Sequence, residues 1–426
     1  MTQENDKDSD NIDADVAVIG AGIIGLSVAM YLQAEGRRVL LIDRKGIGQE
    51  TSAGNAGALA FSDILPLASP RILRQAPRWL MDPLGPLAIR PGYALQIAPW
   101  LMRFGLASRP AAYRASIEAI TALMRLAAQE FGKMLAQANA SYMLRPEGSL
   151  QVYEGEEQFQ ASLAGWEERT KAGIEFEHVS GERLRQLQPG LADSITAGTF
   201  VPQWATVSDP SGVCQALGAH LLKNGAELCQ EQIQNLAPHG NGVAIKLSQG
   251  RVIHAKQAVV ATGAWSGQLA AGLGNSVPLE TERGYNTTLP QSAFDLKRQV
   301  IFGTHGFVAT PLSTGIRIGG AVELGGLKLP PNFQRSADML AKASRLLPGL
   351  RTEGGKQWMG FRPSLPDSLP VIGYSAATSQ VVYAFGHGHL GLTQSAATGK
   401  LVSELLAGKK PSVSLEPFRA DRFRLF

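Results

Sequence analysis

The chain has 426 residues, of which 44% are hydrophobic and 18% are charged, and its formal net charge is +4. This length suits two domains, or one large elaborated domain, with a sizeable core. No Lys/Arg cluster alternates with aromatic residues, so nucleic-acid binding has no support. The two cysteines, Cys214 and Cys229, cannot build a disulfide framework and suit a reducing compartment.

Residues 1–14 are polar and acidic, and we predict that they form a disordered arm. They lack the basic and apolar regions of a signal peptide. The chain also has no apolar run of the length that a membrane-spanning helix needs, about 18 residues. We therefore expect a cytoplasmic protein. His387 and His389 are isolated from other kinds of metal ligand, so no metal site is expected.

The first motif reads as a strand that runs into a tight glycine turn. Residues 15–19 form a short, largely β-branched apolar run, as in a buried parallel strand. Three glycines follow in GxGxxG spacing. Gly20 permits the sharp turn, Gly22 lets a pyrophosphate approach the backbone, and Gly25 lets the helix pack close to the strand. A helix that begins at Ile23 would point free N–H groups at phosphates.

An acidic residue completes this motif. Gly36 marks the end of the helix, a second strand covers 38–42, and Asp43 follows where a carboxylate would accept hydrogen bonds from ribose hydroxyls. The GxGxxG pattern alone is a weak signal, but here the strand, helix and acid stand in the required order. The sequence therefore predicts dinucleotide binding, and Asp43 argues against a 2′-phosphate and hence against NADP.

The next loop, 46–57, is small, polar and rich in glycine. Such a loop can lie against phosphates or a flat ring system. A simple surface connection is the alternative interpretation.

The segment 64–109 has a different character. It carries six arginines against one acidic residue, Asp82, and prolines break it into short amphipathic pieces. These pieces look like helical turns with apolar and basic faces. Attachment to a membrane surface is one interpretation, and a structural cap packed on the rest of the chain is the other.

Further elements follow from periodicity and from breaker residues. Turn-linked strands dominate 277–327. We predict helices at 111–138, 157–172, 181–188, 208–222 and 338–347, and strands at 148–153, 199–202, 227–236, 243–248, 252–255 and 258–262.

Several motifs taken together resemble the FAD-dependent amino-acid oxidoreductases of the D-amino-acid oxidase superfamily, most of all bacterial D-amino-acid or hydroxy-D-proline dehydrogenases. In chain order they are VIGAGIIGLSVAMYL…LIDR, ETSAGNAG, VVATGAWS, ERGYN, WMGFRPSLPDSLPVIG and GHGHLGLTQSAATGK. They span residues 15 to about 408, so the resemblance covers nearly the whole chain. Each motif alone is modest, but their order is specific.

The resemblance implies an α/β and α+β fold with a Rossmann-like FAD-binding domain and a discontinuous antiparallel-sheet substrate domain. The expected FAD-binding parts are 15–63, 190–275 and 356–426. The expected substrate or cap parts are 64–189 and 276–355. The implied cofactor is FAD rather than NAD, and it is non-covalent because no cysteine follows Cys229.

The residues that the resemblance assigns to FAD fall into four groups. Those for the nucleotide end are Gly20, Gly22, Ile23, Ile24, Gly25, Asp43, Arg44 and Ile233. Those near the pyrophosphate and isoalloxazine are Thr51, Ser52, Asn55 and Ala56. Those that close over the pyrophosphate side are Ala261, Thr262 and Gly263. Those that direct backbone N–H groups at the flavin N1–C2=O edge are Gly388, His389, Leu390, Gly391, Leu392 and Thr393.

The substrate of such an enzyme presents a carboxylate, which a bidentate guanidinium recognises best. Arg362, in a Gly-Phe-Arg-Pro turn, is the best candidate, and in this family the arginine of this motif holds the carboxylate. A structural ion pair is the alternative role for Arg362. Arg283 and Tyr285 could add a second clamp and a phenolic hydroxyl.

Arg283 has a competing role, and His389 is a further candidate for the substrate site, whereas His305 and Glu323 are weaker ones. Arg283 could instead face a neighbouring acid, Glu280 or Glu282. His389 could accept a proton from the substrate ammonium, or it could be a structural histidine. For His305 and Glu323, a position on loop or strand surface is favoured over one in the pocket.

The implied reaction is oxidative deamination of a D-amino acid or cyclic imino acid, with hydride transfer from Cα to flavin N5. The imine then hydrolyses to a 2-oxo acid and ammonia. Oxidation of small or N-substituted amino acids, such as glycine or sarcosine, is one alternative. An NAD-dependent dehydrogenase or a nucleotide-binding subunit is another. The electron acceptor is a quinone or oxygen, and a quinone would agree with peripheral contact between 64–109 and the cytoplasmic face of the inner membrane.

Overall fold

The computed structural model describes residues 12–81, 85 and 87–423. Residues 1–11 of the predicted arm lie outside this description. The arm is shorter than predicted at its inner end, because β1 (Ala14–Ile19) already begins at Ala14. The N–H of Asp13 also donates to the His254 carbonyl at 2.9 Å, which ties the entering chain to a neighbouring strand.

Within the described residues, eight strands form a sheet centred on β1, in the order β10-β2-β1-β13-β12-β11, with β20 on β13 and β19 on β20. β10, β2, β1, β13 and β20 are parallel, and β1, β2 and β20 among them are buried, as expected for a parallel sheet covered on both faces. The other bounds are β2 (Val39–Ile42), β10 (Glu227–Cys229), β11 (Ile233–His239), β12 (Gly242–Leu247), β13 (Val252–Val260), β19 (Val371–Tyr374) and β20 (Val381–Phe385).

A second sheet of nine strands in the described part has the order β18-β14-β17-β16-β15-β6-β8-β7, with β4 against β17. Most of its pairs are antiparallel. Its strands are β4 (Leu87–Ile89), β6 (Ser149–Glu154), β7 (Glu177–Ser180), β8 (Ile195–Val201), β14 (Glu280–Leu289), β15 (Gln299–Phe302), β16 (Phe307–Leu312), β17 (Gly315–Leu324) and β18 (Lys356–Ser364). The predicted combination of a Rossmann-like sheet and an antiparallel sheet is therefore observed.

The remaining elements in the described part of the chain are three short strands and the helices. The short strands are β3 (Ala58–Leu59), β5 (Leu144–Arg145) and β9 (Ala205–Val207). The helices are α1 (Ile23–Ala34), α2 (Pro70–Met81), α3 (Ala94–Ala107), α4 (Pro110–Gln137), α5 (Gly155–Lys171), α6 (Gly181–Leu187), α7 (Pro210–Lys223), α8 (Ser266–Gly272), α9 (Gln334–Leu346) and α10 (Gly391–Leu406). None of the helices in the described ranges is long and apolar enough to cross a membrane.

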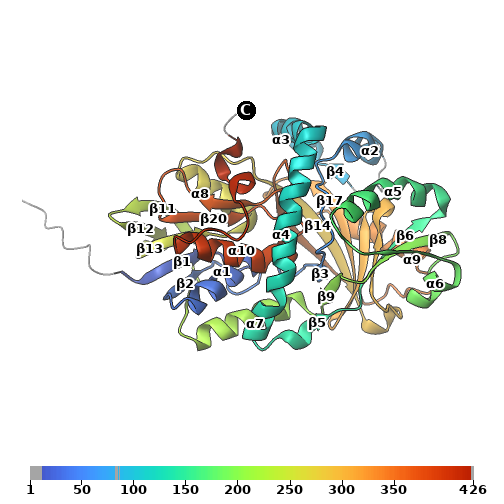
Figure 1. Cartoon of the computed structure of the whole chain (residues 1–426), viewed down its shortest axis with the longest axis horizontal. Coiled ribbons are helices and arrows are strands. Elements are labelled where there is room, and N and C mark those ends of the chain that lie inside the picture. The colour runs from blue at the N-terminus through green and yellow to red at the C-terminus, as the bar shows by residue number, and fades with distance from the viewer. Residues whose placement is uncertain (1–11, 82–84, 86, 424–426) are drawn as a thin grey trace, which may run out of the picture.

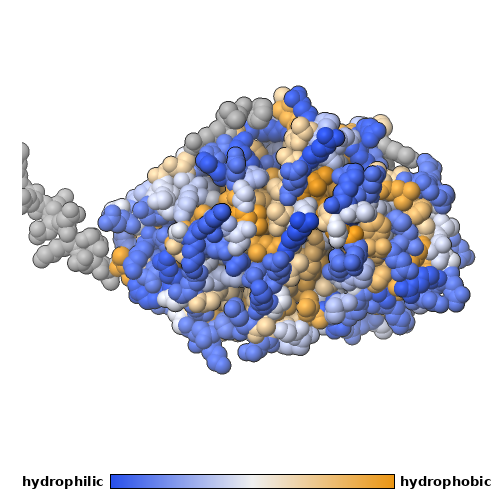
Figure 2. All heavy atoms as spheres, in the orientation of Figure 1, coloured by the Kyte–Doolittle hydropathy of each residue, from blue (hydrophilic) through white to orange (hydrophobic). Residues whose placement is uncertain are grey.

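Helix α4 runs across the middle of the molecule, between the part that contains β1 and the part that contains β6 and β8 (Figure 1). Hydrophobic residues gather along this middle region, and hydrophilic residues cover much of the rest of the same face (Figure 2). The buried residues of α4 join the core of the first half, since Leu123, Ala127 and Phe131 belong to the same apolar cluster as Leu26.

Most predicted elements are confirmed, and the differences have local causes. The predicted strands 252–255 and 258–262 form one strand, β13, because its pairing continues from β12 to β1 and β20 without a break. The proline-rich segment 64–109 forms two proper helices, α2 and α3, with β4 between them.

Sheet membership departs from the predicted division of the chain. β8 and β18 fall in ranges predicted for the FAD-binding part, yet both are strands of the nine-stranded sheet. α4 falls in a range predicted for the substrate part, yet it packs on α1 and α10. The sheet that β8 and β18 join, and the helices on which α4 packs, depend on partners far away in the sequence. The order of the elements along the chain does not show which partners these are. The other domain boundaries stay a prediction.

A substitution at Gly25 tests the close contact between α1 and the glycine turn. A Cβ at this position would lie 1.8 Å from the carbonyl oxygen of Gly20, which is backbone and cannot move aside. We expect Gly25→Ala to lower the free energy of unfolding by at least about 2 kcal/mol. Chemical denaturation measures this change.

Gly132→Ala is the matched control, since it lies within α4 with open space around the added Cβ. It should raise stability by roughly 0.5–1 kcal/mol. Equal stability of Gly25→Ala and the wild type would contradict the close contact.

Candidate active site

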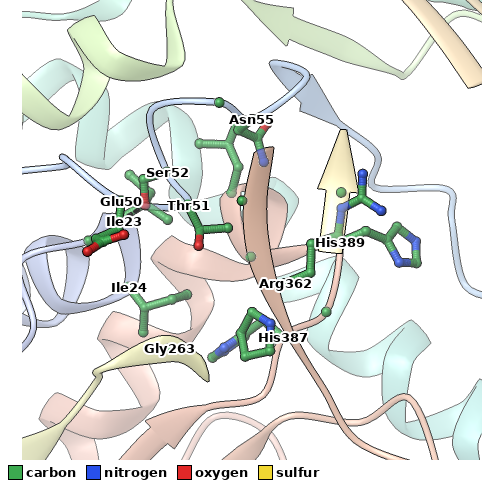
Figure 3. A pocket seen from close by; sticks show the side chains of 18 of the residues that line it. Ile23, Ile24, Glu50, Thr51, Ser52, Asn55, Gly263, Arg362, His387 and His389 are labelled. Atoms are coloured by element: carbon green, nitrogen blue, oxygen red, sulfur yellow. Dashed lines mark hydrogen bonds between the residues drawn. The ribbon is translucent and has the colours of Figure 1, made fainter. Parts of the chain in front are cut away.

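One large cavity, of about 680 Å³, lies where the two sheets meet. The first sheet contributes the carboxyl ends of its parallel strands, including Ile19, Ile42 and Phe385. The second contributes residues of β14, β17 and β18, such as Arg362. In Figure 3, Ile23 and Ser52 lie at one side of this cavity, and Arg362 and His389 lie at the other. Ligands of open parallel sheets bind at this edge.

The glycine turn forms the nucleotide end of the cavity. Gly20 has φ +106°, and a Cβ there would lie 2.4 Å from the Ala261 carbonyl oxygen. Gly22 is the N-cap of α1 and provides no side-chain cap. The hydroxyl oxygen of Ser52 accepts a hydrogen bond from the Ile23 N–H at 3.0 Å. Gly22, Ile23 and Ile24 line the cavity, so the positive end of the α1 dipole faces a ligand bound there.

Asp43 lies at the end of β2, as predicted, and borders the cavity. One carboxylate oxygen accepts the Ala21 N–H at 2.9 Å, and the other accepts the amides of Lys45 and Gly46 at 2.8 and 3.0 Å. These bonds fix the carboxylate beside the glycine turn. The oxygen that accepts the Ala21 N–H, Oδ2, retains acceptor capacity, which a ribose hydroxyl can use.

Arg44 is held in place on the same side of the cavity. Its guanidinium contacts Glu50 at 2.7 Å and lies 3.9 Å from the centroid of the Trp265 ring. Ile233 at the start of β11 and the turn Ala261–Gly263 complete this wall.

The loop 46–57 lies along the cavity and is more than a surface connection. The hydroxyl of Thr51 donates to the Phe361 carbonyl of the second sheet at 2.9 Å. Arg317 of β17 donates to the carbonyl of Asn55 at 2.5 Å, and Asn286 of β14 donates to that of Gly54 at 3.0 Å. The loop therefore spans the junction of the two sheets, with Asn55 and Ala56 facing the cavity.

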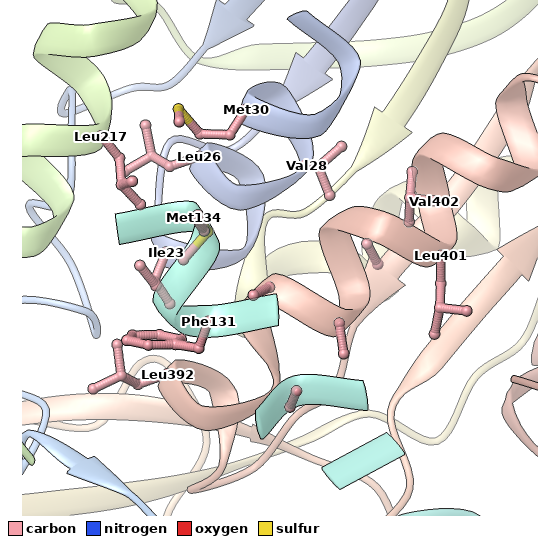
Figure 4. Packing of buried hydrophobic residues seen from close by; sticks show 14 of the residues in the cluster. Ile23, Leu26, Val28, Met30, Phe131, Met134, Leu217, Leu392, Leu401 and Val402 are labelled. Carbon is pink, nitrogen blue, oxygen red and sulfur yellow. The ribbon is translucent and has the colours of Figure 1, made fainter. Parts of the chain in front are cut away.

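Helix α10 presents a second uncapped N-terminus to the cavity. Its N-cap, Leu390, makes no side-chain capping bond, and all residues of 388–393 line the cavity. The hydroxyl of Thr393 donates to the Ala58 carbonyl and accepts the Ala60 N–H, which anchors the turn. Figure 4 shows Leu392 of this helix packed near Phe131 of α4 and Ile23 of α1, so a shared core holds both helix termini in place.

These features fit an FAD molecule. The turn accepts no side chain at Gly20, and the N-termini of α1 and α10, whose N-cap residues make no side-chain capping bond, direct partial positive charge into one cavity. All residues predicted to contact FAD line the cavity except Gly25, which packs against the turn instead.

Arg362 lies on β18 at the far end of the cavity. Its Nη2 donates to the Gly320 carbonyl at 3.3 Å, and no ion pair engages it within the described residues. The guanidinium lies over Gly284 of β14, where a Cβ would come within 2.4 Å of Cζ. Burial lowers the pKa of Arg362, and the nearby charge of Glu282 opposes this shift. A half-buried cation that borders the cavity with so few partners favours an anionic ligand.

The structure places Arg283 and Tyr285 differently from the prediction. Successive side chains of a strand point to opposite faces, so Glu282, Gly284 and Asn286 share the cavity side of β14, and all three line the cavity. Arg283 is fully buried behind the strand, outside the cavity lining, where it pairs with Glu323 at 2.9 Å. This role replaces that of a second substrate clamp.

Tyr285 and Glu323 belong to the same buried network. The Tyr285 hydroxyl donates to Glu323 at 3.0 Å and accepts the Asn332 N–H at 3.0 Å. Although Tyr285 borders the cavity, its hydroxyl is therefore engaged on the other side. Glu323 itself is buried and absent from the cavity lining. His305 also lies outside the lining and pairs with Glu154 at 2.7 Å.

The two histidines of the GHGH motif both line the cavity but differ in environment. His389 is exposed, and its Nε2 lies 3.4 Å from Asp63, which also pairs with Arg169. His387 is buried against the Thr398 hydroxyl at 2.9 Å, and burial lowers the pKa of His387 to about 3. His387 is therefore neutral at physiological pH.

Sequence reasoning did not place Glu282, Gly284 or His387 in the cavity. The sequence does indicate that Glu282 and Gly284 share one face of a strand, because they stand on either side of Arg283. His387 belongs to the GHGHLG motif, in which the resemblance gives a role only to the residues from Gly388 onwards.

The space over Gly284 can be tested by substitution. Gly284→Ala adds a methyl group where the Arg362 guanidinium lies, so the arginine must move away from Gly320. We expect carboxylate ligands to bind roughly tenfold more weakly, while the distant nucleotide end is unaffected. Ligand titration and flavin content of the purified variant measure the two effects. Unchanged carboxylate affinity would contradict this placement of the guanidinium.

The model for "FAD dependent oxidoreductase" proteins matches residues 15–405. A "D-amino-acid oxidase" of Bradyrhizobium diazoefficiens is 36% identical over 96% of this chain and 98% of its own length. A "D-amino acid dehydrogenase" of Xylella fastidiosa is 30% identical over 96% of this chain and 95% of its own length.

Among solved structures, glycine oxidase from Geobacillus kaustophilus has a TM-score of 0.75 at 22% identity, covering 96% of this chain and 98% of its own. L-proline dehydrogenase from P. horikoshii has a TM-score of 0.74 at 20% identity, covering 97% and 98%. These two share the fold. Because the family model and the relatives cover nearly the whole chain, the protein belongs to the FAD-dependent oxidoreductases of the D-amino-acid oxidase type, and its cofactor is FAD.

Proposed function

We propose that the protein oxidises a D-amino acid or a cyclic imino acid of the D-proline type to the corresponding imine. The observation that carries this proposal is Arg362, whose half-buried guanidinium borders the cavity with one long hydrogen bond and no ion pair among the described residues. A substrate carboxylate supplies the missing partner. The names of the relatives from Bradyrhizobium and Xylella support a D-amino acid as the substrate class.

The chain's own residues bind and orient the substrate. Arg362 fixes the carboxylate, and the wall formed by Gly284 and Gly320 sets how far the substrate can approach β14 and β17. Bound FAD supplies the hydride acceptor for the substrate Cα–H. His387 lines the same cavity and is neutral, because burial lowers its pKa to about 3. The substrate amine must lose its proton before oxidation.

The imine leaves the site and reacts with water. A primary amino acid then gives a 2-oxo acid and ammonia, whereas a cyclic substrate gives a cyclic imine. Oxidation of glycine or sarcosine is the second candidate, because the fold is also that of glycine oxidase. An NAD-dependent dehydrogenase is set aside, since the family match is to FAD-dependent proteins.

A substrate panel separates these candidates. D-proline, hydroxy-D-proline, D-alanine, their L-enantiomers, glycine and sarcosine should be tested with an artificial electron acceptor and, in parallel, with an oxygen electrode. We expect the D-amino or D-imino acids to be oxidised fastest. The ratio of the two rates identifies the protein as an oxidase or as a dehydrogenase, and for a dehydrogenase a quinone added as the acceptor tests whether it receives the electrons.

Arg362→Ala tests the carboxylate contact. Loss of a charged bidentate interaction of this kind should lower kcat/KM by roughly 100-fold, or about 3 kcal/mol. FAD content should remain normal because Arg362 lies at the side of the cavity opposite Ile23, at the N-terminus of α1 (Figure 3). Near-normal kinetics in this variant would rule out the carboxylate role.

Contact with the cytoplasmic face of a membrane is proposed for α2 and α3. Met81, Leu95 and Met102 are 78%, 91% and 72% exposed on these helices. Exposed arginines, such as Arg71 and Arg74, accompany them on α2. Apolar side chains beside arginines suit an interface with anionic lipid headgroups.

Vesicle binding tests this contact. The protein should sediment with vesicles that contain anionic lipid at low salt and be released by high salt, because salt screens the arginine charges. Neutral vesicles and the double variant Leu95→Ser/Met102→Ser are the controls, and both should bind more weakly. Failure to sediment at low salt would count against membrane contact.

A further inference from the structure

Glu282 is a buried carboxylate on the cavity wall that the proposed contact with the substrate carboxylate does not use. It is 7% exposed and borders the cavity from β14. No hydrogen bond or ion pair engages its side chain within the described residues. A carboxylate removed from water without a partner is costly, so a ligand cation is the natural partner.

Its environment sets Glu282 apart from the other carboxylates that border the cavity in the described part of the chain. Asp63 pairs with Arg169, and Glu50 pairs with Arg44. Asp43 accepts three backbone amides, and Glu231 accepts the Gln249 amide at 2.6 Å. Each of these four is satisfied by the protein itself, whereas Glu282 is not.

Arg362 is the direct cross-strand neighbour of Glu282 in the antiparallel pair of β14 and β18. Such neighbours have Cβ atoms about 4.5–5.5 Å apart and project from the same face. The two charges nevertheless form no ion pair. The guanidinium is instead turned along the strand, over Gly284, and is held there by the Gly320 carbonyl.

The result is a cation and an anion that lie side by side on one wall of the cavity. Their charges still interact, because Glu282 raises the pKa of Arg362 against the effect of burial. An amino acid carries the complementary arrangement, with its carboxylate and its nitrogen attached to the same carbon. A basic side chain would carry its cation several bonds further from the carboxylate.

We propose that Glu282 binds the α-nitrogen of the substrate while Arg362 binds its carboxylate, so that the pair selects α-amino and α-imino acids over acids without nitrogen. This inference rests on the proposed function and extends it from the substrate carboxylate to the substrate amine. It also gives β14 a defined role, in which Glu282 contacts the ligand and Gly284 makes room for the arginine.

The test compares ligands that differ only in the nitrogen. D-proline is paired with cyclopentanecarboxylate, and D-alanine with propanoate. Binding is measured by calorimetry on the FAD-loaded protein after chemical reduction, so that the amino acid binds without being oxidised. Measuring binding in this way keeps the result independent of whether the enzyme turns the ligand over.

In Glu282→Gln we expect both D-amino acids to bind at least about tenfold more weakly. The nitrogen-free acids should bind equally well or more tightly, because a repelling carboxylate has been removed. Glu282→Asp, which keeps the charge, should retain a preference for the amino acids. Thermal unfolding and flavin content establish that each variant is folded and loaded.

Glu280→Gln is the matched control. Glu280 lies two residues along the same strand but outside the cavity lining, where the Tyr93 hydroxyl donates to it at 2.7 Å. This variant should leave the ratio of amino-acid to carboxylate affinity unchanged.

An equal change for both members of a ligand pair in Glu282→Gln, or no change, would overturn the inference. A loss restricted to D-lysine and D-arginine, added as a third arm, would also overturn it, because Glu282 would then bind a side-chain cation. Failure of the proposed function looks different: the wild-type protein would bind the D-amino acids with the predicted dependence on Glu282 and yet oxidise none of them.

Discussion

The position of the cofactor site depends on the close backbone contact between the glycine turn and the first helix, α1. Gly25 lets α1 approach the Gly20 carbonyl, and Gly20 lets the turn pass beneath Ala261. These contacts put the N-terminus of α1 at the edge of the parallel strands. The core shared with α4 and α10 then brings the N-terminus of α10 to the same cavity. The cofactor site therefore depends on contacts that tolerate no added side chain.

The substrate end depends on a different constraint, the alternation of side chains on β14. One face of this strand carries Glu282 and Gly284 toward the cavity, and the other carries Arg283 and Tyr285 into a buried network with Glu323. Two arginines of nearby motifs thus have unlike roles. Arg283 is neutralised within the protein, whereas Arg362 has a charge that a ligand can use.

Much of the nucleotide site could be predicted from the sequence, because the motif from Gly20 to Asp43 is local and each residue has one physical role. The residues at the substrate end of the cavity are harder to predict from the sequence. Alternation shows that Glu282 and Gly284 share a face, but it does not show which face meets the cavity. That depends on pairing with β17 and β18, and the buried role of Arg283 depends on Glu323, forty residues away.

The most direct test of this account is a crystal structure of the reduced, FAD-loaded protein with a bound D-amino acid. The account predicts the ligand carboxylate within about 3 Å of the Arg362 guanidinium, with the α-nitrogen on the side of Glu282. A ligand carboxylate bound elsewhere, with Arg362 still in contact with Gly320 alone, would contradict it.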